Sequence, residues 1–165
     1  MVCEDESIFV YDSAVRKIWA RKGTRPIVIK TGSHRRTCVF GSISSDRRQL
    51  FRQTRRINGE EFVKYLKELK RKFGKFLLFI DGAPWHRRKC VNEYFERNRD
   101  FISPIFFPKC SPEFNPVEEC WNRAKDDVVG NTIYPTFEEL KHEIAKYFRT
   151  KRFKLDVVNY LCPRL

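Results

Sequence analysis

The first part of the chain is patterned in short runs of strand length. Residues 7–11, 25–31, 36–43 and 50–55 are apolar or alternate apolar with polar positions. Turn residues at 32–35 separate the second run from the third, which predicts that those two runs pair as a hairpin. Residues 50–55 are expected to extend this antiparallel meander at an edge of the sheet.

The next stretch changes from strand to helix and back. Residues 58–74 repeat apolar positions with helical spacing, with Asn58 as the expected N-cap and Gly74 at the C-terminal stop. The run FLLFI at 76–80 is short, uninterrupted and bounded by helix-breaking residues. That pattern predicts a strand that is buried on both faces in a parallel sheet.

Helices and strands continue to alternate toward the C-terminus. The pattern predicts a helix over residues 86–99, a second short buried strand over 103–107 and a helix within 113–129 that follows a proline. Residues 136–148 form an amphipathic pattern behind a Thr-x-x-Glu capping box. An antiparallel meander followed by strand–helix–strand units predicts an α/β fold with a mixed sheet, flanked by helices.

Composition narrows the class of partner. The chain of 165 residues is 41% hydrophobic and has the length of one ordinary domain. Its 34 Lys and Arg outnumber 21 Asp and Glu, for a net charge of +13. A surface of that charge favours a polyanion, and nucleic acid is the first choice because each neutralised phosphate releases counterions.

The absence of targeting signals and the spacing of the cysteines predict a cytoplasmic protein. No apolar run approaches the ~20 residues of a membrane span. The first residues, MVCEDES, lack the basic and apolar regions of a signal peptide. The six cysteines are scattered without a CxxC pair, as expected for reduced thiols in the cytosol. We therefore expect no membrane partner.

Three acidic positions stand where an α/β sheet gathers functional groups. Asp81 directly follows the FLLFI run, Asp5 lies near the N-terminus and Glu118 lies at the start of a predicted helix. Functional groups in open α/β sheets collect beyond the carboxyl ends of parallel strands. If the first strand pairs beside 76–80, Asp5 becomes the neighbour of Asp81. Three converging carboxylates repel one another, and hard oxygen ligands of this kind suit magnesium or manganese.

Structural alternatives exist for each acid. Asp81 could cap the turn that follows it, Asp5 could be a frayed terminal residue, and Glu119 could be the inward-facing residue in place of Glu118. Trp85 and Trp121 fit the core better than they fit base-stacking platforms. Further carboxylates that position alone does not exclude are Asp12, Asp100, Asp126 and Asp127.

Three segments together resemble the catalytic core of DDE transposases of the mariner-like superfamily, and within it the prokaryotic insertion-sequence family numbered six-thirty. The segments are CEDES at 3–7, LLFIDGAPWH at 77–86 and FPKCSPEFNPVEECWN at 107–122. Residues 18–26, IWARKGTRP, also resemble a family segment. The resemblance runs across nearly the whole chain, and its Asn-Pro-x-Glu block is the most specific part.

The resemblance implies a ribonuclease H-like fold with a five-stranded mixed sheet. It implies that Asp5, Asp81 and Glu118 are catalytic and hold two divalent metal ions, Mg²⁺ or its substitute Mn²⁺. It selects Glu118 over Glu119 and Asp5 over Asp12. Glu6, His86 and Asn115 are then expected as neighbours of the site.

The same resemblance implies DNA cleavage followed by strand transfer during transposition of an insertion sequence. The partners would be double-stranded DNA at the terminal inverted repeats and at a target, with TA dinucleotides as target sites, in the prokaryotic nucleoid. Family members act as dimers, which suggests a homodimer. Residues 1–165 would form a single catalytic domain, and the family's N-terminal helix-turn-helix region is expected to be absent. Alternatives are a ribonuclease H-like nuclease without strand transfer and an inactive nucleic-acid-binding remnant.

Two basic stretches are candidates for contact with the DNA backbone, with a solvated basic edge strand and tail as the plain alternative. The first is DRRQLFRQTRR at 46–56, and the second is RTKRFK at 149–154. The candidate DNA-binding residues are Arg47, Arg48, Arg52, Arg55, Arg56, Lys151 and Arg152.

Overall fold

The computed structural model describes residues 1–12, 21–24, 32–108, 111–130 and 132–162, and five strands of these residues form one mixed sheet. The sheet has the order β3-β2-β1-β4-β5, in which β1–β2 and β2–β3 pair antiparallel and β1–β4 and β4–β5 pair parallel. This confirms the meander followed by parallel strands. The strands are β1 (Val2–Val10), β2 (Arg36–Ser44), β3 (Gln49–Thr54), β4 (Phe76–Ile80) and β5 (Ile102–Phe106).

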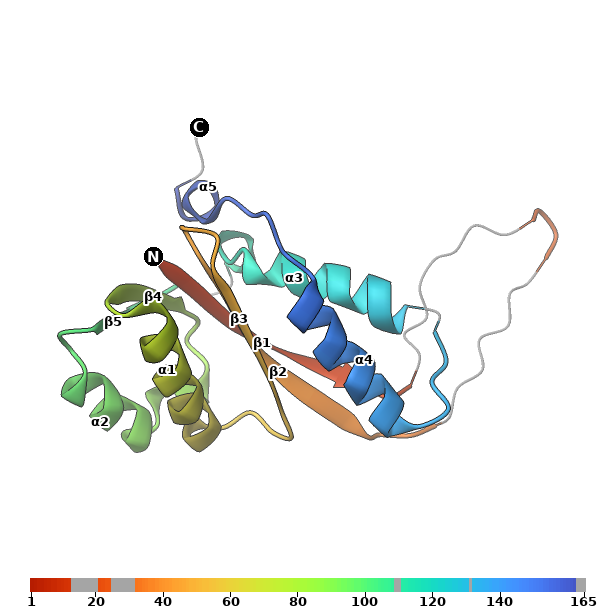
Figure 1. Ribbon diagram of the computed structural model, residues 1–165, viewed down its shortest axis with the longest axis horizontal. Coiled ribbons are helices and arrows are strands. Elements are labelled where there is room, and N and C mark those ends of the chain that lie inside the picture. The colour runs from red at the N-terminus through yellow and green to blue at the C-terminus, as the bar shows by residue number, and fades with distance from the viewer. Residues whose placement is uncertain (13–20, 25–31, 109–110, 131, 163–165) are drawn as a thin grey trace.

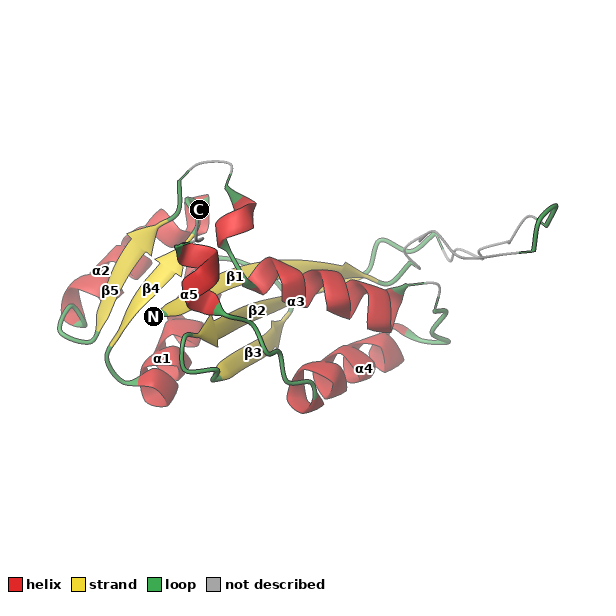
Figure 2. Ribbon diagram, turned by 90° about the horizontal axis from the view of Figure 1, so that it is seen from above, coloured by secondary structure: helices red, strands yellow, loops and turns green. Residues whose placement is uncertain are grey.

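Helices cover both faces of the sheet. Figure 1 shows α1 and α2 on one side of the sheet and α3 and α4 on the other. Figure 2 shows the strands between the two helical layers from above. No described helix combines the length and apolar character needed to cross a membrane. The helices are α1 (Gly59–Phe73), α2 (Lys89–Arg97), α3 (Val117–Ala124), α4 (Phe137–Thr150) and α5 (Val157–Leu161).

The two faces bury separate cores. On the α1 side, Phe62, Leu66 and Leu69 pack with Leu78 and Ile80 of β4. On the α3 and α4 side, aromatic rings dominate: Phe51 stacks on Phe148 with ring centroids 4.5 Å apart, and Trp121 meets both rings edge to face. Aromatic residues bury large apolar areas, so a 165-residue chain obtains two cores from one sheet.

Alternation along β1 sends its residues to both cores. Cys3 and Phe9 belong to the core on the α3 and α4 side, and Val2 belongs to the core on the α1 side. Successive side chains of a strand point to opposite faces, so Asp5 shares the face of Cys3 while Glu4 and Glu6 share the face of Val2.

The predicted burial of β4 and β5 was wrong in part. Leu77 of β4 remains 42% exposed, and only Ile102 of β5 is buried, with Ile105 and Phe106 exposed. The reason is the sheet order. β5 is an edge strand, and α3 and α4 cover the β1–β3 half of their face, so they leave part of β4 uncovered. An uninterrupted apolar run therefore did not mean burial on both faces.

One predicted helix is shorter than its pattern suggested, and another is confirmed. A 3₁₀ turn occupies Pro84–Arg87, and Arg88 has extended backbone before α2 begins, so the prediction of one helix over 86–99 was wrong. The helix predicted to follow a proline within 113–129 is present: α3 begins directly after Pro116, and a π-helical turn at Lys125–Val129 continues it. A 3₁₀ turn at Pro112–Phe114 precedes it. The proline at the start of the 3₁₀ turn Pro84–Arg87 supplies the physical reason for the shorter helix.

Other predicted elements are confirmed, and one cannot be compared. The strands at 36–43 and 50–55 correspond to β2 and β3, and β3 is an edge strand. Thr136 caps α4 by accepting a hydrogen bond from the backbone N–H of Glu139 at 3.2 Å. The predicted strand at 25–31, and with it the hairpin, lies outside the described residues.

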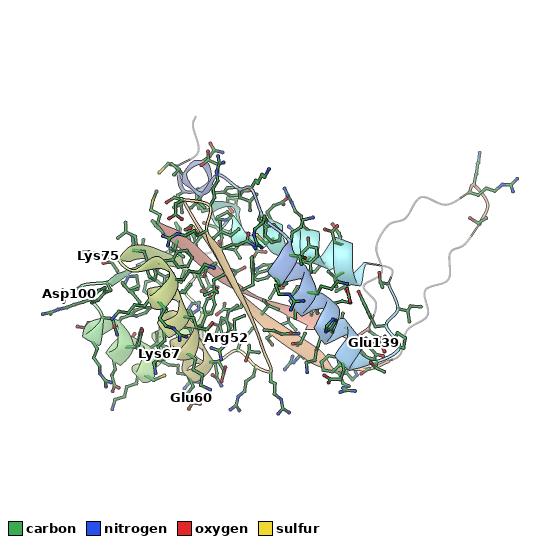
Figure 3. All side chains as sticks on the ribbon, viewed as in Figure 1. Arg52, Glu60, Lys67, Lys75, Asp100 and Glu139 are labelled. Carbon is green, nitrogen blue, oxygen red and sulfur yellow. The ribbon has the colours of Figure 1, made fainter. Side chains whose placement is uncertain are left out.

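The cap of α1 generates a test of the fold. The Asn58 side chain accepts a hydrogen bond from the backbone N–H of Glu61 at 2.8 Å. The change Asn58→Ala leaves that donor without its protein partner and is expected to lower the free energy of unfolding by ~1 kcal/mol in urea titrations. Lys67→Ala on the exposed side of the same helix (Figure 3) is the control, expected within about 0.5 kcal/mol of the parent protein. An equal loss in both variants would contradict the role of the cap.

Candidate functional site

Parallel pairing of β1 with β4 brings two acids from distant parts of the sequence together. Val2 pairs with Leu78, and Cys3 pairs with Phe79. Two positions farther along each chain lie Asp5 and Asp81, so the same register places the acids side by side. Asp5 lies inside β1, which overturns the reading of Asp5 as a frayed terminal acid.

A pocket of about 420 Å³ gathers the three predicted carboxylates. Asp5 enters from β1, Asp81 from the end of β4, and Glu118 from the first turn of α3. The remaining wall comes from the residues after β4 and before α3. The described lining residues are Asp5, Asp81, Gly82, Ala83, Phe107, Pro108, Ser111, Pro112, Asn115 and Glu118.

A hydrogen bond from Trp121 of α3 orients the side chain of Asp5. The indole Nε1–H of Trp121 donates this hydrogen bond of 2.7 Å to Oδ2 of Asp5, and the indole ring is almost fully buried. Gly41 of β2 pairs directly opposite Asp5. A Cβ at Gly41 would lie 2.7 Å from Cζ2 of Trp121, so only glycine leaves room for the indole in this position.

Burial and neighbouring negative charges raise the pKa of Asp5. Burial and the negative charge of Glu118 raise its pKa to about 8, against the smaller opposing effect of the Trp121 hydrogen bond. In the absence of a cation, the folded protein therefore favours the protonated form of Asp5 at neutral pH. Hard oxygen donors that repel each other in one pocket fit a divalent cation such as Mg²⁺, which would remove this repulsion.

Asn115 fixes the start of α3 against β1. Its side chain is buried, and Nδ2 donates a hydrogen bond of 3.0 Å to the backbone carbonyl of Glu4. Its Oδ1 accepts from the backbone N–H of Val117 at 3.2 Å. One amide thus joins the strand that carries Asp5 to the helix that carries Glu118, which explains an Asn immediately before Pro116.

Asp81 carries both a turn and an ion pair on one oxygen. Its Oδ1 accepts from the backbone N–H of Ala83 at 2.9 Å, so the predicted turn cap is also formed. Nδ1 of His86 lies 2.9 Å from the same Oδ1. The His86 hydrogen bond is the main reason that the pKa of Asp81 falls below its usual range.

His86 also reaches the acids on the opposite face of β1. Its Nε2 lies 3.0 Å from Oε1 of Glu6 and 3.7 Å from Oε2 of Glu4. Burial lowers the pKa of His86, but the hydrogen bonds to Asp81 and Glu6 and the charge of Glu4 outweigh it and raise the pKa to about 11. Burial and the charge of Glu6 raise the pKa of Glu4. His86 contacts both Asp81 and Glu6 of β1, but neither Glu6 nor His86 is among the residues that line the pocket.

The rival carboxylates lie elsewhere. Glu119 pairs with Arg123 on the outer side of α3, at 2.8 Å between Oε1 and Nε, while Glu118 faces the pocket. Asp127 pairs with Lys151 and accepts from the hydroxyl of Tyr147. Asp100 lies at the outer margin of the molecule beyond α2 (Figure 3). Among the described residues, the pocket lining includes neither these acids nor Asp12 and Asp126.

The two basic stretches meet in a second hollow of about 530 Å³ between the edge strand β3 and α4, which we call the basic hollow. Arg47 and Arg48 come from the first stretch, Arg149 and Arg152 from the second, and Lys72 from the end of α1. Its described lining contains no carboxylate. Arg48 pairs with Asp46, and its Nη1 donates to the backbone carbonyl of Lys72 at 2.7 Å.

The other predicted basic residues are placed differently. Arg52 is half-buried and paired with Glu61 and Glu68 of α1, and Lys151 is paired with Asp127. Arg55 and Arg56 line a separate pocket together with Thr54 and Glu61.

The strand order, the mixed pairing and the three carboxylates beside the central strands define a ribonuclease H-like fold. A sequence model of the DDE superfamily endonucleases matches residues 1–141, which is most of the chain. The chain belongs to this family.

Comparison with solved structures supports the fold. The chain is similar to the Mos1 transposase paired-end complex with the left transposon end, with a TM-score of 0.69 and 15% identity over 97% of this chain and 49% of that one. For the mariner Mos1 paired-end complex with Mg, the TM-score is 0.70 at 14% identity, over 97% and 52% of the two chains. The catalytic domain of Mos1 mariner transposase gives 0.59 at 14% identity, over 97% and 72%.

One curated relative is closer in sequence but covers less. The uncharacterized protein y4pE/y4sA of Sinorhizobium fredii is 31% identical over 64 residues, which are 39% of this chain and 44% of that protein. The chain therefore spans about half the length of the Mos1 complexes and less than half of this relative.

Sequence reasoning missed the residues that hold the acids in place. Trp121 was expected in the core, and its burial confirms this, but its hydrogen bond to Asp5 was not anticipated. The available signal was its helical spacing of three from Glu118, which puts both side chains on one side of α3. Gly41 carried no signal of its own, because its role depends on the pairing of β2 with β1.

The raised pKa of Asp5 generates a prediction for the metal-free protein in EDTA. Because the folded-state pKa of about 8 exceeds the ordinary value of 3.8, stability contributed by protonated Asp5 is lost as pH rises from 4 to 8. Asp5→Asn should have little effect at pH 4 and should raise the free energy of unfolding by at least ~1 kcal/mol at pH 8. Urea titrations at both pH values measure this. A variant that is no more stable than the parent protein at pH 8 would contradict the charge crowding.

Proposed function

We propose that this chain is the catalytic domain of a DDE transposase, which cleaves DNA with the help of divalent metal ions and joins the freed end to a target. The observation that carries the proposal is one pocket lined by Asp5, Asp81 and Glu118, in a chain that belongs to the DDE superfamily endonucleases. The likeness in fold to Mos1 transposase, crystallised as a strand transfer complex, supports the same reaction class.

The donor set supports Asp5, Asp81 and Glu118 as the metal ligands. All three offer hard carboxylate oxygens, and Mos1 paired-end complexes have been solved with Mg and with Mn. Two such ions would activate the attacking oxygen and stabilise the leaving oxygen of a phosphodiester. A bound cation would relieve the repulsion between Asp5 and Glu118 that burial strengthens.

The remaining residues of the site orient these acids. Trp121 holds one oxygen of Asp5 through a buried hydrogen bond, and Ala83 holds one oxygen of Asp81 through its backbone N–H. Asn115 fixes the helix that carries Glu118. Preorganised ligands reduce the cost of reorganisation during reaction, since less side-chain freedom must be lost.

Double-stranded DNA is the proposed partner, and the basic hollow is its proposed backbone contact. The net charge of +13 supports a polyanionic partner, and the hollow gathers five cations without a lining carboxylate. Arg47 and Arg149 are the best candidates, since neither forms an ion pair with another described residue. Arg52 and Lys151 are poorer candidates because acidic side chains already neutralise them.

The finer assignment rests on sequence resemblance. We propose an insertion-sequence transposase of the mariner-like branch that recognises terminal inverted repeats and inserts at TA dinucleotides. A homodimer and action in the prokaryotic cytoplasm belong to the same proposal.

The central reaction is tested by nicking of supercoiled plasmid DNA with Mg²⁺ or Mn²⁺. The parent protein is expected to nick, and Asp81→Asn should lower the rate at least ~100-fold, because it removes a metal ligand from a pocket that supplies several kcal/mol of transition-state stabilisation. EDTA should abolish nicking by the parent protein.

Asp100→Asn is the matched control, since it removes the same charge from an exposed residue outside the pocket. Equal nicking by the parent protein and by Asp81→Asn would contradict a mechanism in which Asp81 is a metal ligand. Nicking without joining of a 3′-hydroxyl oligonucleotide to the plasmid would identify a nuclease, and absence of nicking in all three proteins would identify an inactive remnant.

The basic hollow is tested by DNA binding in EDTA, which separates binding from cleavage. The double variant Arg47→Gln/Arg149→Gln should weaken binding of a 30-base-pair duplex at low salt and reduce the slope of log K against log salt by about 2. Lys67→Gln/Lys75→Gln carries the same change in charge at exposed residues outside the hollow, which like Arg47 and Arg149 form no ion pair with another described residue, and should leave the slope nearly unchanged. Equal losses in the two double variants would show that net charge alone, and not the hollow, binds DNA.

A further inference from the structure

His86 connects the two acidic strands through the interior of the protein. Only 1% of its side chain is exposed, and both ring nitrogens are engaged. Nδ1 lies 2.9 Å from Oδ1 of Asp81, and Nε2 lies 3.0 Å from Oε1 of Glu6. Glu6 belongs to the strand of Asp5, so one imidazole joins the loop after β4 to β1.

The inner end of this connection is itself fixed. The indole Nε1–H of Trp85 donates a hydrogen bond of 2.7 Å to the same Oε1 of Glu6. The ring of Phe62 in α1 packs against the imidazole, with centroids 4.4 Å apart. His86 therefore has little freedom to turn, and its orientation is set by side chains of Glu6, Trp85 and Phe62, none of which lines the pocket.

The outer end leaves one oxygen of Asp81 available. The Asp81 side chain is 51% exposed, so packing alone does not select its rotamer. Both of its described contacts, from Ala83 N–H and from His86, fall on Oδ1. Asp81 lines the pocket, and neither of these donors engages its Oδ2.

We propose that His86 is a positioning residue for Asp81, held in place by Glu6 and Trp85. This inference rests on the proposed function, in which Asp81 is a metal ligand. His86 fixes the carboxylate in the orientation that binds a cation, as partners of ligands commonly do in metal sites. It also ties the chain after β4 to β1, so it preserves the side-by-side placement of Asp81 and Asp5.

A metal ion bound by Glu4, Glu6 and His86 is the competing explanation of the same cluster. One ligand atom from each residue lies within 4.8 Å of the others, and both carboxylate oxygens of Glu4 are buried without a hydrogen-bond partner. Two contacts argue against it. Nε2 already engages Oε1 of Glu6, and the Trp85 N–H donates to the same oxygen.

Two amide substitutions separate the ends of the connection. In His86→Asn, the amide nitrogen takes the approximate place of Nδ1 and can still donate to Asp81. In His86→Gln, the amide nitrogen takes the approximate place of Nε2, which keeps the contact with Glu6 and loses the one with Asp81. The proposal predicts that Mn²⁺ affinity, measured by electron paramagnetic resonance without DNA, falls ~10-fold or more in His86→Gln. His86→Asn should recover most of this loss.

A double-mutant cycle tests whether His86 acts through Asp81. In the Asp81→Asn background, His86→Gln should cause no further loss of Mn²⁺ affinity, because the group it positions is gone. His34→Gln and His142→Gln alter the two other histidines of the chain, both exposed, and should bind Mn²⁺ as the parent protein does. Equal Mn²⁺ affinity in His86→Gln and the parent protein, or an additive loss in the cycle, overturns the proposal.

Two further measurements distinguish a positioning role of His86 from a loss of folding and from a failure of the proposed function. Trp85→Phe, at a partly exposed position, removes the indole N–H that donates to Glu6 and to Nε2 of His86, and it should weaken Mn²⁺ binding in the same direction as His86→Gln but less. Crystal structures of the metal-free proteins show the rotamer of Asp81 independently of any bound ion. Asp81 should keep one rotamer in the parent protein and lose it in His86→Gln, and an unchanged rotamer contradicts the proposal even if the parent protein proves inactive.

Metal analysis of the purified parent protein decides between the two explanations of the cluster. A stoichiometric metal that survives Asp81→Asn but is lost in both His86→Asn and His86→Gln would overturn the positioning role in favour of a buried metal site. Absence of such a metal, together with the losses above, supports the positioning role.

Discussion

The structure depends first on the parallel pairing of β1 with β4. β1 is central, with antiparallel β2 on one side and parallel β4 on the other, so it belongs to both halves of the sheet. The register that pairs Cys3 with Phe79 also brings Asp5 beside Asp81. A shift of this register by one residue would send Asp5 to the α1 face, because the side chains of a strand alternate.

Three consecutive acids in β1 serve two faces of the sheet. Asp5 lies on the face of α3, where Trp121 and Glu118 meet it. Glu4 and Glu6 lie on the face of α1, where His86 is their cationic partner. Buried carboxylates are costly without such partners. His86 supplies such a partner, and its contacts join Glu6 of β1 to Asp81 in the pocket on the other face of the sheet.

The sequence predicted the elements better than their environment. Helical spacing and capping residues identified α1 and α4 correctly, and the alternation of strands and helices predicted the mixed sheet. The apolar runs of β4 and β5 misled because burial depends on which helices cover a strand, and a run of letters does not contain that information. The 3₁₀ turn that begins at Pro84 shortened the helix predicted over 86–99.

For the candidate site too, the sequence predicted the main residues but not their surroundings. Asp5, Asp81 and Glu118 could be selected from sequence only with the help of a family resemblance, and the structure brings all three to one pocket. The contacts that orient them could not be predicted. The bond from Trp121 to Asp5 requires space at Gly41 across the sheet, and the contact from His86 to Glu6 spans 80 positions in sequence. Such pairs become visible only when the strand register is known.

The most direct test of the central claim is anomalous diffraction from crystals of the protein soaked in Mn²⁺. The account predicts anomalous density in the pocket of Asp5, Asp81 and Glu118, with ligand distances typical of carboxylate oxygen, and loss of this density in Asp81→Asn crystals. Density confined to Glu4, Glu6 and His86, or no density in the pocket at saturating Mn²⁺, would contradict it.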